Sequence, residues 1–501
     1  MRRVLIVGGG SSGWITATYL DAVLNRRGQK TVDITLVESP AIGRIGVGEA
    51  TIPTIRETLK TIGIDELSLM RTASATFKQG IDFRDWKTLG HSYFHPFDRC
   101  APSNYFDNAG AEWLFSNQAV SFADTVSAQP RCAYAGLSPK LDKQLNYQGL
   151  FNYAYHMDAE AFAEYLAELG TSRGVKRVLA TVKEVGLRGD GNVSFVRTGD
   201  GTKFAADLFI DCSGFSSLLR RQAMQAEFLD YSQWLPCDRA VVLRQPHALE
   251  KNSNLKPYTT ATAMSAGWRW DISLQNRRGI GYVHSSRFIS ESDAEVELRE
   301  ATGLLDTDIE PLKVRFKTGR LAAQWEKNCL AIGLSGGFVE PLESTGLYLV
   351  EIAAKTLCEY FPYLGSHDEL SERFNKIIGD RYEEILDFIV LHYCLSERRD
   401  SEFWEYVTNL ENTPKSLYKY LKMLECKPPS EADFASSLRL FSYINYEYIL
   451  FGMDWTPRSV NSIPADNRRP AVIPKVMDEW VEHARNTCAP HTQSILTAVN
   501  A

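Results

Sequence analysis

The segment Phe338–Gly346, with the sequence FVEPLESTG, combines residue types that can hold an anion beside a carboxylate. Glu343 directly precedes a hydroxyl pair and a glycine, Ser344–Gly346. Small residues at such a turn let backbone N–H groups face a small anion. The apolar approach Ala331–Leu334 predicts that a buried strand leads into the turn. Taken alone, the same pattern also fits a glycine-containing loop with a solvated glutamate.

A second chemically informative residue is Lys78, which lies in an apolar to neutral stretch with Phe77, Ile81 and Phe83. Most lysines are solvated surface charges, and that interpretation stays open here. A lysine held in apolar surroundings behaves differently. Its ammonium can donate a directed hydrogen bond, and desolvation can lower its pKa enough for nucleophilic chemistry.

An aromatic segment with one imidazole follows, formed by Tyr93, Phe94 and then His95–Phe97. Such a wall can sandwich a planar substrate, although core packing is the alternative.

The segment Trp268–Ser273, with the sequence WRWDIS, alternates like a strand and places Trp268 and Trp270 on one face. Two indoles on one face are usually part of a core. They can also form a bulky wall that keeps large substrates away from a cofactor.

The N-terminus carries the pattern that positions a dinucleotide. Arg3–Val7 predicts a strand, GGGSSG follows, and residues 14–24 predict a helix. A second strand is predicted over Val32–Val37 and ends at Glu38. In such a βαβ unit the glycines allow a tight turn, the pyrophosphate rests on the helix N-terminus, and the acid accepts hydrogen bonds from a ribose. The sequence therefore predicts nucleotide binding.

A further glycine-spaced turn, Gly46–Thr51, comes soon after the second strand, and Pro53 suits the first turn of a helix. Such a turn can pass beneath an isoalloxazine ring, although an ordinary βα loop is the alternative.

The order of the segments predicts an α/β fold. Asp158 starts an amphipathic helix that is predicted to end at Gly170, and Asp207–Gly214 reads as a strand ending in an acid and a small-residue turn. We expect a Rossmann-like, GR2-type FAD-binding fold with an inserted β-rich substrate region and a mostly helical C-terminal region. The predicted FAD-binding module spans residues 1–80, 150–220 and 310–365. The insertions span 81–149 and 221–309, and the C-terminal substrate-binding region spans 366–501.

Composition limits the class of protein and its partners. The chain has 501 residues, 44% of them hydrophobic and 23% charged, which is typical of a globular protein. Its net charge of −7 comes from interleaved acids and bases, which argues against a nucleic-acid partner. No apolar run predicts a membrane span. The nine cysteines are scattered without a Cys-x-x-Cys pair, which predicts reduced thiols, a cytoplasmic protein and no metal site.

With these residues in view, the chain resembles the flavin-dependent halogenases of the tryptophan halogenase family. The motifs that carry the resemblance are GGGSSGW, GVGEAT, FKQGIDFRDW, FHPF, YAYHMDA, DCSGF, TTATAMSAGWRW and FVEPLESTG. They run to about residue 360, after which the resemblance weakens. It implies that reduced FAD from a separate flavin reductase reacts with O₂ and chloride or bromide to give hypohalous acid. This oxidant would pass through a tunnel to Lys78, which orients it or forms a haloamine, while Glu343 stabilises the cationic arene.

The resemblance also implies roles for individual residues. Cofactor contacts are expected from Gly8, Gly10, Ser12, Gly13, Glu38, Gly48, Glu49, Ala50, Asp211, Gly333 and Gly346. Halide contacts are expected from Ser344, Thr345 and Gly346. Substrate contacts are expected from His95, Pro96, Phe97 and Tyr448, and Trp268 and Trp270 are expected to shield the flavin.

Two departures from the family pattern bear on the substrate. The proline that ends the family's WxWxIP motif is Ser273 here, and Phe441–Tyr448 does not align with the anchors that hold free tryptophan. Glu447 in that segment is expected to be exposed, and contact with an ammonium group is the alternative. Indole, a substituted indole or a larger indole-bearing molecule is therefore favoured over free tryptophan. The halide and the choice between monomer and homodimer stay open.

Two other functions compete with halogenation. A flavin-dependent aromatic monooxygenase would not need Lys78 and Glu343 together, and it would gain nothing from a tryptophan wall. A non-catalytic flavin-binding protein would tolerate the loss of the lysine and the glutamate.

Overall fold

The computed structural model describes residues 2–26, 29–43, 48–97, 109–141, 144, 146–250, 254–364, 368–434, 439–461 and 468–500. The chain divides into two compact units, each built from separate stretches of sequence. The first unit comprises Met1–Ala75, Met157–Tyr231 and Phe316–Glu383, and the second comprises Thr76–His156, Ser232–Arg315 and Glu384–Ala501. Among the described residues, no helix has the length and apolar character needed to cross a lipid bilayer.

The first unit contains a six-stranded sheet with the order β21-β22-β13-β1-β2-β9. All neighbouring pairs from β22 to β9 are parallel, and β21 is antiparallel to β22. The bounds are β21 (Trp325–Glu326), β22 (Cys329–Ala331), β13 (Leu208–Asp211), β1 (Arg3–Val7), β2 (Asp33–Glu38) and β9 (Lys176–Leu179). Parallel strands of this kind are apolar on both sides because both faces of the sheet are covered.

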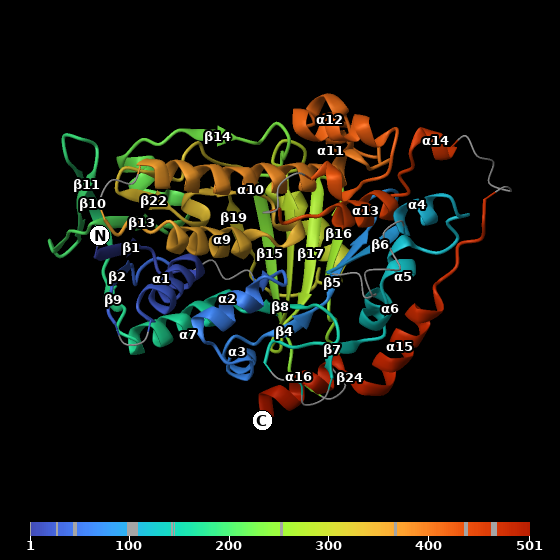
Figure 1. The fold of residues 1–501 in the computed structure, drawn as a ribbon, viewed down its shortest axis with the longest axis horizontal. Coiled ribbons are helices and arrows are strands. Elements are labelled where there is room, and N and C mark those ends of the chain that lie inside the picture. The colour runs from blue at the N-terminus through green and yellow to red at the C-terminus, as the bar shows by residue number, and fades with distance from the viewer. Residues whose placement is uncertain are drawn as a thin grey trace. The chain divides into compact units, whose positions relative to one another are not determined.

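Helices cover one face of this sheet, and a smaller sheet covers the other. Helix α1 packs against α7 and α9, as Figure 1 shows. The bounds are α1 (Ser11–Leu24), α7 (Ala159–Ser172) and α9 (Gly346–Glu359). On the other face, Leu5, Val7 and Val37 form a buried cluster with Val193 and Val196 of the sheet β10-β11-β12. The bounds of that sheet are β10 (Val182–Leu187), β11 (Val193–Thr198) and β12 (Lys203–Phe204).

Helix α7 begins where the sequence predicts but ends later. The Asp158 carboxylate accepts hydrogen bonds from the backbone N–H groups of Glu160 and Ala161, so Asp158 is the N-cap. The prediction that the helix ends at Gly170 is wrong. A Cβ at Gly170 would lie 3.2 Å from the Trp14 ring, so the glycine serves close helix packing, and the helix continues to Ser172.

The remaining elements of the first unit are short. The helices are α2 (Ile55–Ile62) and α3 (Glu66–Thr72), and β3 spans Glu49–Ala50. A three-stranded sheet consists of β14 (Phe228–Asp230), β20 (Gly319–Leu321) and β23 (Gly337–Phe338). Pro53 precedes α2 by two residues and therefore lies outside the helix that it was predicted to start.

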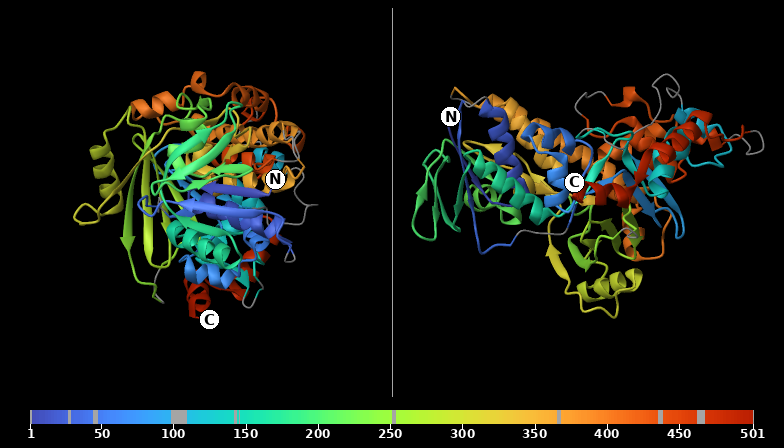
Figure 2. Two further views of the ribbon diagram at one scale, coloured as in Figure 1. Left: turned by 90° about the vertical axis from the view of Figure 1, so that its left-hand side faces the viewer. Right: turned by 90° about the horizontal axis from the view of Figure 1, so that it is seen from below.

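The second unit contains a seven-stranded sheet with the order β19-β15-β18-β17-β16-β5-β6. Only β16 and β5 pair in parallel. The bounds are β19 (Leu312–Arg315), β15 (Arg239–Pro246), β18 (Arg277–His284), β17 (Gly267–Ser273), β16 (Thr259–Met264), β5 (Gly80–Arg84) and β6 (Ser92–Pro96). Helix α8 (Glu291–Thr302) lies against β15 and β18, as Figure 2 shows, and buries Ala294 and Leu298 there. The β-rich region predicted from Trp268 to Tyr282 is confirmed.

Two smaller strand pairs complete the second unit's sheets. β4 (Thr76–Lys78) pairs antiparallel with β8 (Ala154–Met157), and β7 (Leu137–Leu141) pairs antiparallel with β24 (Cys488–Pro490).

Most described residues of the C-terminal region are helical, as predicted. The helices are α10 (Asp368–Cys394), α11 (Glu402–Val407), α12 (Lys415–Leu424), α13 (Tyr443–Gly452), α14 (Arg458–Asn461), α15 (Lys475–Thr487) and α16 (His491–Asn500). α10 begins in the first unit and continues into the second from Glu384 onward. Three short helices of the second unit come earlier in the chain, α4 (Ala109–Leu114), α5 (Phe122–Val126) and α6 (Gln129–Tyr134).

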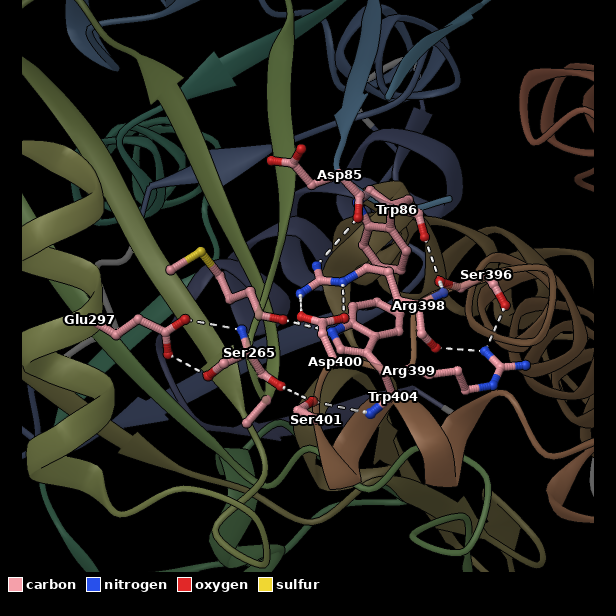
Figure 3. A network of polar contacts seen from close by, with 12 residues as sticks. Asp85, Trp86, Ser265, Glu297, Ser396, Arg398, Arg399, Asp400, Ser401 and Trp404 are labelled. Carbon is pink, nitrogen blue, oxygen red and sulfur yellow. Dashed lines mark hydrogen bonds and ion pairs between the residues drawn. The ribbon is translucent and has the colours of Figure 1, made fainter. Parts of the chain in front are cut away.

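Hydrogen bonds attach the segment between α10 and α11 to the seven-stranded sheet (Figure 3). The Ser396 hydroxyl donates to the Trp86 carbonyl oxygen at 2.6 Å, and the Ser401 hydroxyl donates to the Ser265 carbonyl oxygen at 2.6 Å. The Trp404 indole N–H adds a third such bond at 2.8 Å. These donors satisfy backbone carbonyl groups in and beside the sheet, which otherwise would be costly to bury.

Candidate functional site

The βα turn after β1 accepts only glycine at three positions. Gly8 has φ +116°, and a Cβ there would lie 2.1 Å from the Cys212 carbonyl oxygen. A Cβ at Gly13 would lie 1.9 Å from the Gly8 carbonyl oxygen. A Cβ at Gly9 would lie 1.7 Å from the Glu38 carboxylate. The turn therefore packs tightly against the chain on both sides, as a dinucleotide-binding turn requires.

The N-terminus of α1 is open to an anion. Gly10 caps the helix without a side-chain hydrogen bond, and the first turn contains no acidic residue. A Cβ at Gly10 would meet no heavy atom within 4 Å. The first N–H groups of a helix have no intrahelical acceptors, and the helix dipole favours negative charge there. The site fits the pyrophosphate of FAD.

Glu38 lies at the end of β2 and is buried. Its carboxylate accepts a hydrogen bond from Arg177 Nε of the neighbouring strand β9 at 2.5 Å, and Arg177 also pairs with Glu164 at 2.7 Å. The Arg177 guanidinium therefore orients Glu38 beside the glycine turn. Arg177 and Glu164 were not identified from the sequence, because only the order of the strands brings them to Glu38.

Asp211 lies at the end of β13, and its carboxylate is engaged by the chain itself. It accepts hydrogen bonds from the backbone N–H groups of Ser213, Leu219 and Arg220 at 2.8 to 3.0 Å, and from the Ser213 hydroxyl at 2.5 Å. Asp211 thus shapes the turn that follows β13. Its predicted contact with the cofactor stays a prediction. Cys212 and Cys329 are buried, as expected for cysteines in a core.

Part of the second glycine turn is described. Gly46 and Val47 lie outside the described residues, whereas Gly48 has φ +82° and Glu49 and Ala50 form β3. Desolvation raises the pKa of the Glu49 carboxyl to about 7.

We expect Gly8→Ala to lose bound FAD and to lower thermal stability. The added methyl group would collide with the Cys212 carbonyl oxygen at a backbone conformation that L-residues rarely adopt, a cost on the order of 1–3 kcal/mol or more. The ratio of flavin to protein absorbance and a melting curve measure both effects. Gly189→Ala is the matched control, because a Cβ there meets nothing within 4 Å. Equal flavin retention by both variants would contradict the prediction.

The segment leading to Glu343 differs from the expected strand. β22 ends at Ala331, and Gly333, with φ +73°, starts a short 3₁₀ helix over Gly333–Ser335. A Cβ at Gly333 would lie 2.2 Å from the Ser12 hydroxyl oxygen of α1, so these two predicted cofactor residues are neighbours. The expected strand over Ala331–Leu334 is therefore wrong in its C-terminal part, because the backbone turns left-handed at Gly333.

Glu343, Ser344 and Thr345 are buried, and the exposed Gly346 begins a long helix. Glu343 ends a 3₁₀ helix and is 3% exposed, and Ser344 adopts φ +60°. α9 then begins at Gly346 with no side-chain cap and no acidic residue in its first turn. The buried Thr345 hydroxyl has no hydrogen-bond partner among the described residues, and a Cβ at Gly346 would meet nothing within 4 Å. Unused N–H groups and a free hydroxyl beside open space fit a halide ion.

A second buried glutamate lies on the same helix and was not identified from the sequence. Glu351 accepts a hydrogen bond from the Thr58 hydroxyl of α2 at 2.6 Å. Burial raises the pKa of its carboxyl to about 8. Its burial is a consequence of the α2–α9 packing, which a lone acid in a helical sequence does not reveal.

Glu351 should make folding stability depend on pH. Its carboxyl has a pKa of about 8 in the folded chain, compared with the ordinary pKa of 4.5, so the folded state binds the proton more tightly than the unfolded state. The free energy of unfolding therefore falls as pH rises from about 4.5 to about 8. In Glu351→Gln this slope disappears. We expect the variant's unfolding free energy to gain about 3–4 kcal/mol relative to wild type between pH 5 and pH 8. Urea denaturation at both pH values measures the difference, and parallel curves for the two proteins would contradict it.

Lys78 lies in β4 of the second unit and is fully buried. Its ammonium lies 5.2 Å from the ring centroid of Phe97. In the antiparallel pair with β8, Lys78 is opposite the small residue Ala154. The interpretation of Lys78 as a solvated surface charge is therefore wrong.

The predicted substrate residues of the second unit gather around one aromatic cluster. The His95 ring lies 5.7 Å from Tyr448 and 6.0 Å from Phe388, measured between ring centroids. His95 Nε2 lies 3.2 Å from the Asn445 amide nitrogen. Pro96 ends β6, and the Phe97 backbone N–H donates to the Gln129 side chain at 3.1 Å.

Glu447 is buried, although the sequence predicted an exposed side chain. It is 3% exposed, and a Cβ at Gly110 would lie 2.0 Å from its carboxylate. The expectation of an exposed acid is wrong, because α13 is buried on more than one side and its hydrophobic pattern has no polar face.

Trp268 and Trp270 are neighbours on β17. Their ring centroids lie 6.2 Å apart, and Trp268 is buried whereas Trp270 is half-buried. A Cβ at Gly281 on the adjacent strand would lie 2.0 Å from the Trp270 indole, so that glycine makes room for the ring. Their shared face, predicted from the alternation, is confirmed.

Two groups of predicted residues are thus assembled, one in each unit. The first unit brings together the glycine turn, Glu38, Gly333 and the Glu343–Gly346 turn. The second unit contains Lys78, the aromatic cluster and the two tryptophans.

Comparisons with known proteins identify the family of this chain. A family model described as tryptophan halogenase matches residues 3–467. Tryptophan 6-halogenase SttH of Streptomyces toxytricini is 36% identical over 472 residues, covering 90% of this chain and 89% of SttH. Tryptophan 7-halogenase RebH of Lentzea aerocolonigenes is 38% identical over 426 residues, covering 80% of this chain and 78% of RebH. The crystal structure of a tryptophan halogenase from Shewanella frigidimarina matches with a TM-score of 0.91 at 31% identity, covering 100% of this chain and 98% of that one.

The family match continues well beyond residue 360, where the motif resemblance weakens. Flavin-dependent tryptophan halogenases use reduced FAD, O₂ and chloride or bromide, and a separate flavin reductase supplies the reduced FAD. The glycine turn and the open N-terminus of α1 fit that cofactor. The chain therefore belongs to the tryptophan halogenase family of flavin-dependent halogenases.

Proposed function

We propose that this protein halogenates an electron-rich, indole-like arene through hypohalous acid, with Lys78 and Glu343 as its catalytic residues. The observation that carries the proposal is the Glu343–Gly346 turn. It combines a buried carboxylate with a helix N-terminus that has no side-chain cap and no acid in its first turn, and with a Thr345 hydroxyl that has no hydrogen-bond partner among the described residues.

When bound, reduced FAD would supply two electrons to O₂, and the halide ion would supply two more on becoming hypohalous acid, with one molecule of water formed. The chain's own part in this step is to hold FAD by Gly8, Gly10 and Gly13 and to hold the halide by Thr345 and Gly346. Ser12, Gly333 and Glu38 support the same turn, with Glu38 directed to the ribose. Gly48, Glu49 and Ala50 belong to the second flavin contact.

Lys78 receives the oxidant and orients it. Its ammonium donates a hydrogen bond to hypohalous acid, or its amine forms a haloamine, and full burial makes either interaction stronger than it would be in water. The ring carbon attacks the halogen of hypohalous acid, the O–X bond breaks, and the released hydroxide with the ring proton becomes water. If a haloamine forms first, water leaves in that step, the N–X bond then breaks, and the ring proton returns to the amine.

Glu343 acts on the arene. The ring becomes cationic when the carbon–halogen bond forms, and a buried carboxylate stabilises that charge and can accept the ring proton. A neutral amide at the same place would offer neither the charge nor the proton acceptor.

The substrate is proposed to be an indole or an indole-bearing molecule held against His95, Pro96, Phe97 and Tyr448. The relatives SttH and RebH are named as tryptophan halogenases. The proposal favours an indole over free tryptophan because Phe441–Tyr448 does not align with the family's anchors for the amino acid backbone. Trp268 and Trp270 would keep the arene away from the flavin.

The test is an incubation of the protein with FAD, a flavin reductase, NADH and bromide or chloride. A panel of indole, substituted indoles, tryptophan and an indole-bearing peptide is read by mass spectrometry. Mono-halogenated products support the proposal, and their yields rank the arenes. Hydroxylated products without halogen would replace it with the monooxygenase function.

The partners and the location are part of the same proposal. The reductase is expected to act transiently, and light scattering distinguishes a monomer from a homodimer. A cytoplasmic location is proposed because the nine cysteines are scattered along the sequence without a Cys-x-x-Cys pair.

A further inference from the structure

The β4–β8 strand pair places a histidine beside Lys78. His156 lies directly opposite Thr76, and Ala154 lies directly opposite Lys78. Because side chains two residues apart share a face of a strand, Thr76, Lys78 and His156 project to the same side of the pair. His156 is fully buried.

The hydrogen bonds of His156 define its tautomer. The Thr76 hydroxyl donates its only proton to the Ser273 carbonyl oxygen at 2.6 Å. Its oxygen can therefore only accept from His156 Nδ1, which lies 3.5 Å away. His156 Nε2 lies 2.9 Å from the Thr259 hydroxyl. In a neutral imidazole the proton is therefore on Nδ1, and Thr259 donates to Nε2.

The charges around His156 favour the same state. Burial holds the pKa of His156 well below its usual value, and the nearby Lys78 and His491 lower it further. His491, from α16, is itself buried, and burial lowers its pKa to about 3. The two buried histidines near this strand pair therefore add no positive charge.

We propose that His156 is a positioning residue for Lys78: with Thr76 and Thr259 it links β4 to β16 and to Ser273 of β17, and so holds the Lys78 ammonium in one place without adding charge. The inference rests on the proposed function of Lys78. In the same network the Ser273 carbonyl oxygen accepts the hydrogen bond from Thr76. Ser273 is the last residue of β17, the strand that carries both tryptophans.

The kinetic test compares three variants by the ratio of halogenated arene to FADH₂ oxidised. His156→Phe removes both hydrogen bonds and should lower the ratio on the order of tenfold, because a small displacement of a reacting group is costly. His156→Gln keeps a donor and an acceptor and should restore most of the ratio. His491→Phe is the matched control, because both of its ring nitrogens lack partners among the described residues, and it should stay close to wild type.

Two results would overturn the inference. One is a wild-type ratio in His156→Phe. The other is an equal loss in His156→Phe, His156→Gln and His491→Phe that follows their melting temperatures, since that pattern marks a purely structural role.

A spectroscopic test does not depend on halogenation. In protein with ¹⁵N-labelled histidine, the signal that disappears in His156→Gln should show a neutral ring protonated on Nδ1 at pH 7 and should not titrate down to pH 5. An Nε2–H tautomer or an imidazolium would overturn the inference. Absence of halogenated product from wild type with every arene would instead refute the proposed function, and the tautomer would still be measured.

Discussion

Lys78→Ala is expected to abolish arene halogenation while O₂ continues to oxidise FADH₂. The only group that orients the electrophilic halogen in the proposed mechanism is removed, so product should fall by at least on the order of 10³-fold. FAD binding should persist, because the glycine turn belongs to the first unit and Lys78 to the second. Mass spectrometry of the arene and absorbance of the flavin measure the two activities separately.

Two further variants make the Lys78 result specific. Lys78→Met fills the buried space without a nitrogen, so its inactivity would exclude a cavity as the cause. Lys140→Ala is the matched control, because its ammonium also lies over an aromatic ring, 5.6 Å from the Tyr153 centroid. Halogenation by Lys78→Ala at the wild-type rate would remove this lysine from the mechanism.

Glu343→Gln is expected to slow product formation by about 10²–10³-fold with FAD binding intact. The amide has nearly the same shape as the carboxylate, so the buried turn should be preserved. It lacks the negative charge that stabilises the cationic ring and cannot accept the ring proton. Single-turnover product formation with saturating arene measures the chemical step.

Glu351→Gln is the control for this substitution, since it changes another buried glutamate of the same unit. Its carboxyl is largely protonated at neutral pH, where an amide resembles it, so product formation should be unchanged. An unchanged rate in Glu343→Gln would show that the carboxylate has no part in the reaction. An equal loss in both variants would attribute the effect to packing.

Features set by local chemistry were predictable from the sequence. The strand Arg3–Val7 was recognised because a short apolar run before GGGSSG has few other uses. The Asp158 cap and the shared face of Trp268 and Trp270 follow from one hydrogen bond and from the twofold period of a strand.

Features set by packing were missed or misplaced. Gly170 looks like a helix end, but it lies beneath Trp14 within the last turn of α7. Glu447 looks exposed, but α13 is buried around it. Arg177 is the partner of Glu38, and Glu351 is the partner of Thr58. Both pairs join strands or helices that meet only in the folded chain.

The family, the flavin cofactor and the residue types for an anion beside a carboxylate were evident from the sequence, because these depend on short motifs in a known order. The folded structure was needed to show that Lys78 is fully buried, that the Thr345 hydroxyl lacks a partner among the described residues, and that His156 is buried between two threonines. Burial and hydrogen bonding are properties of neighbours distant in sequence, and these neighbours, more than the residue type, set the charge and orientation of a side chain.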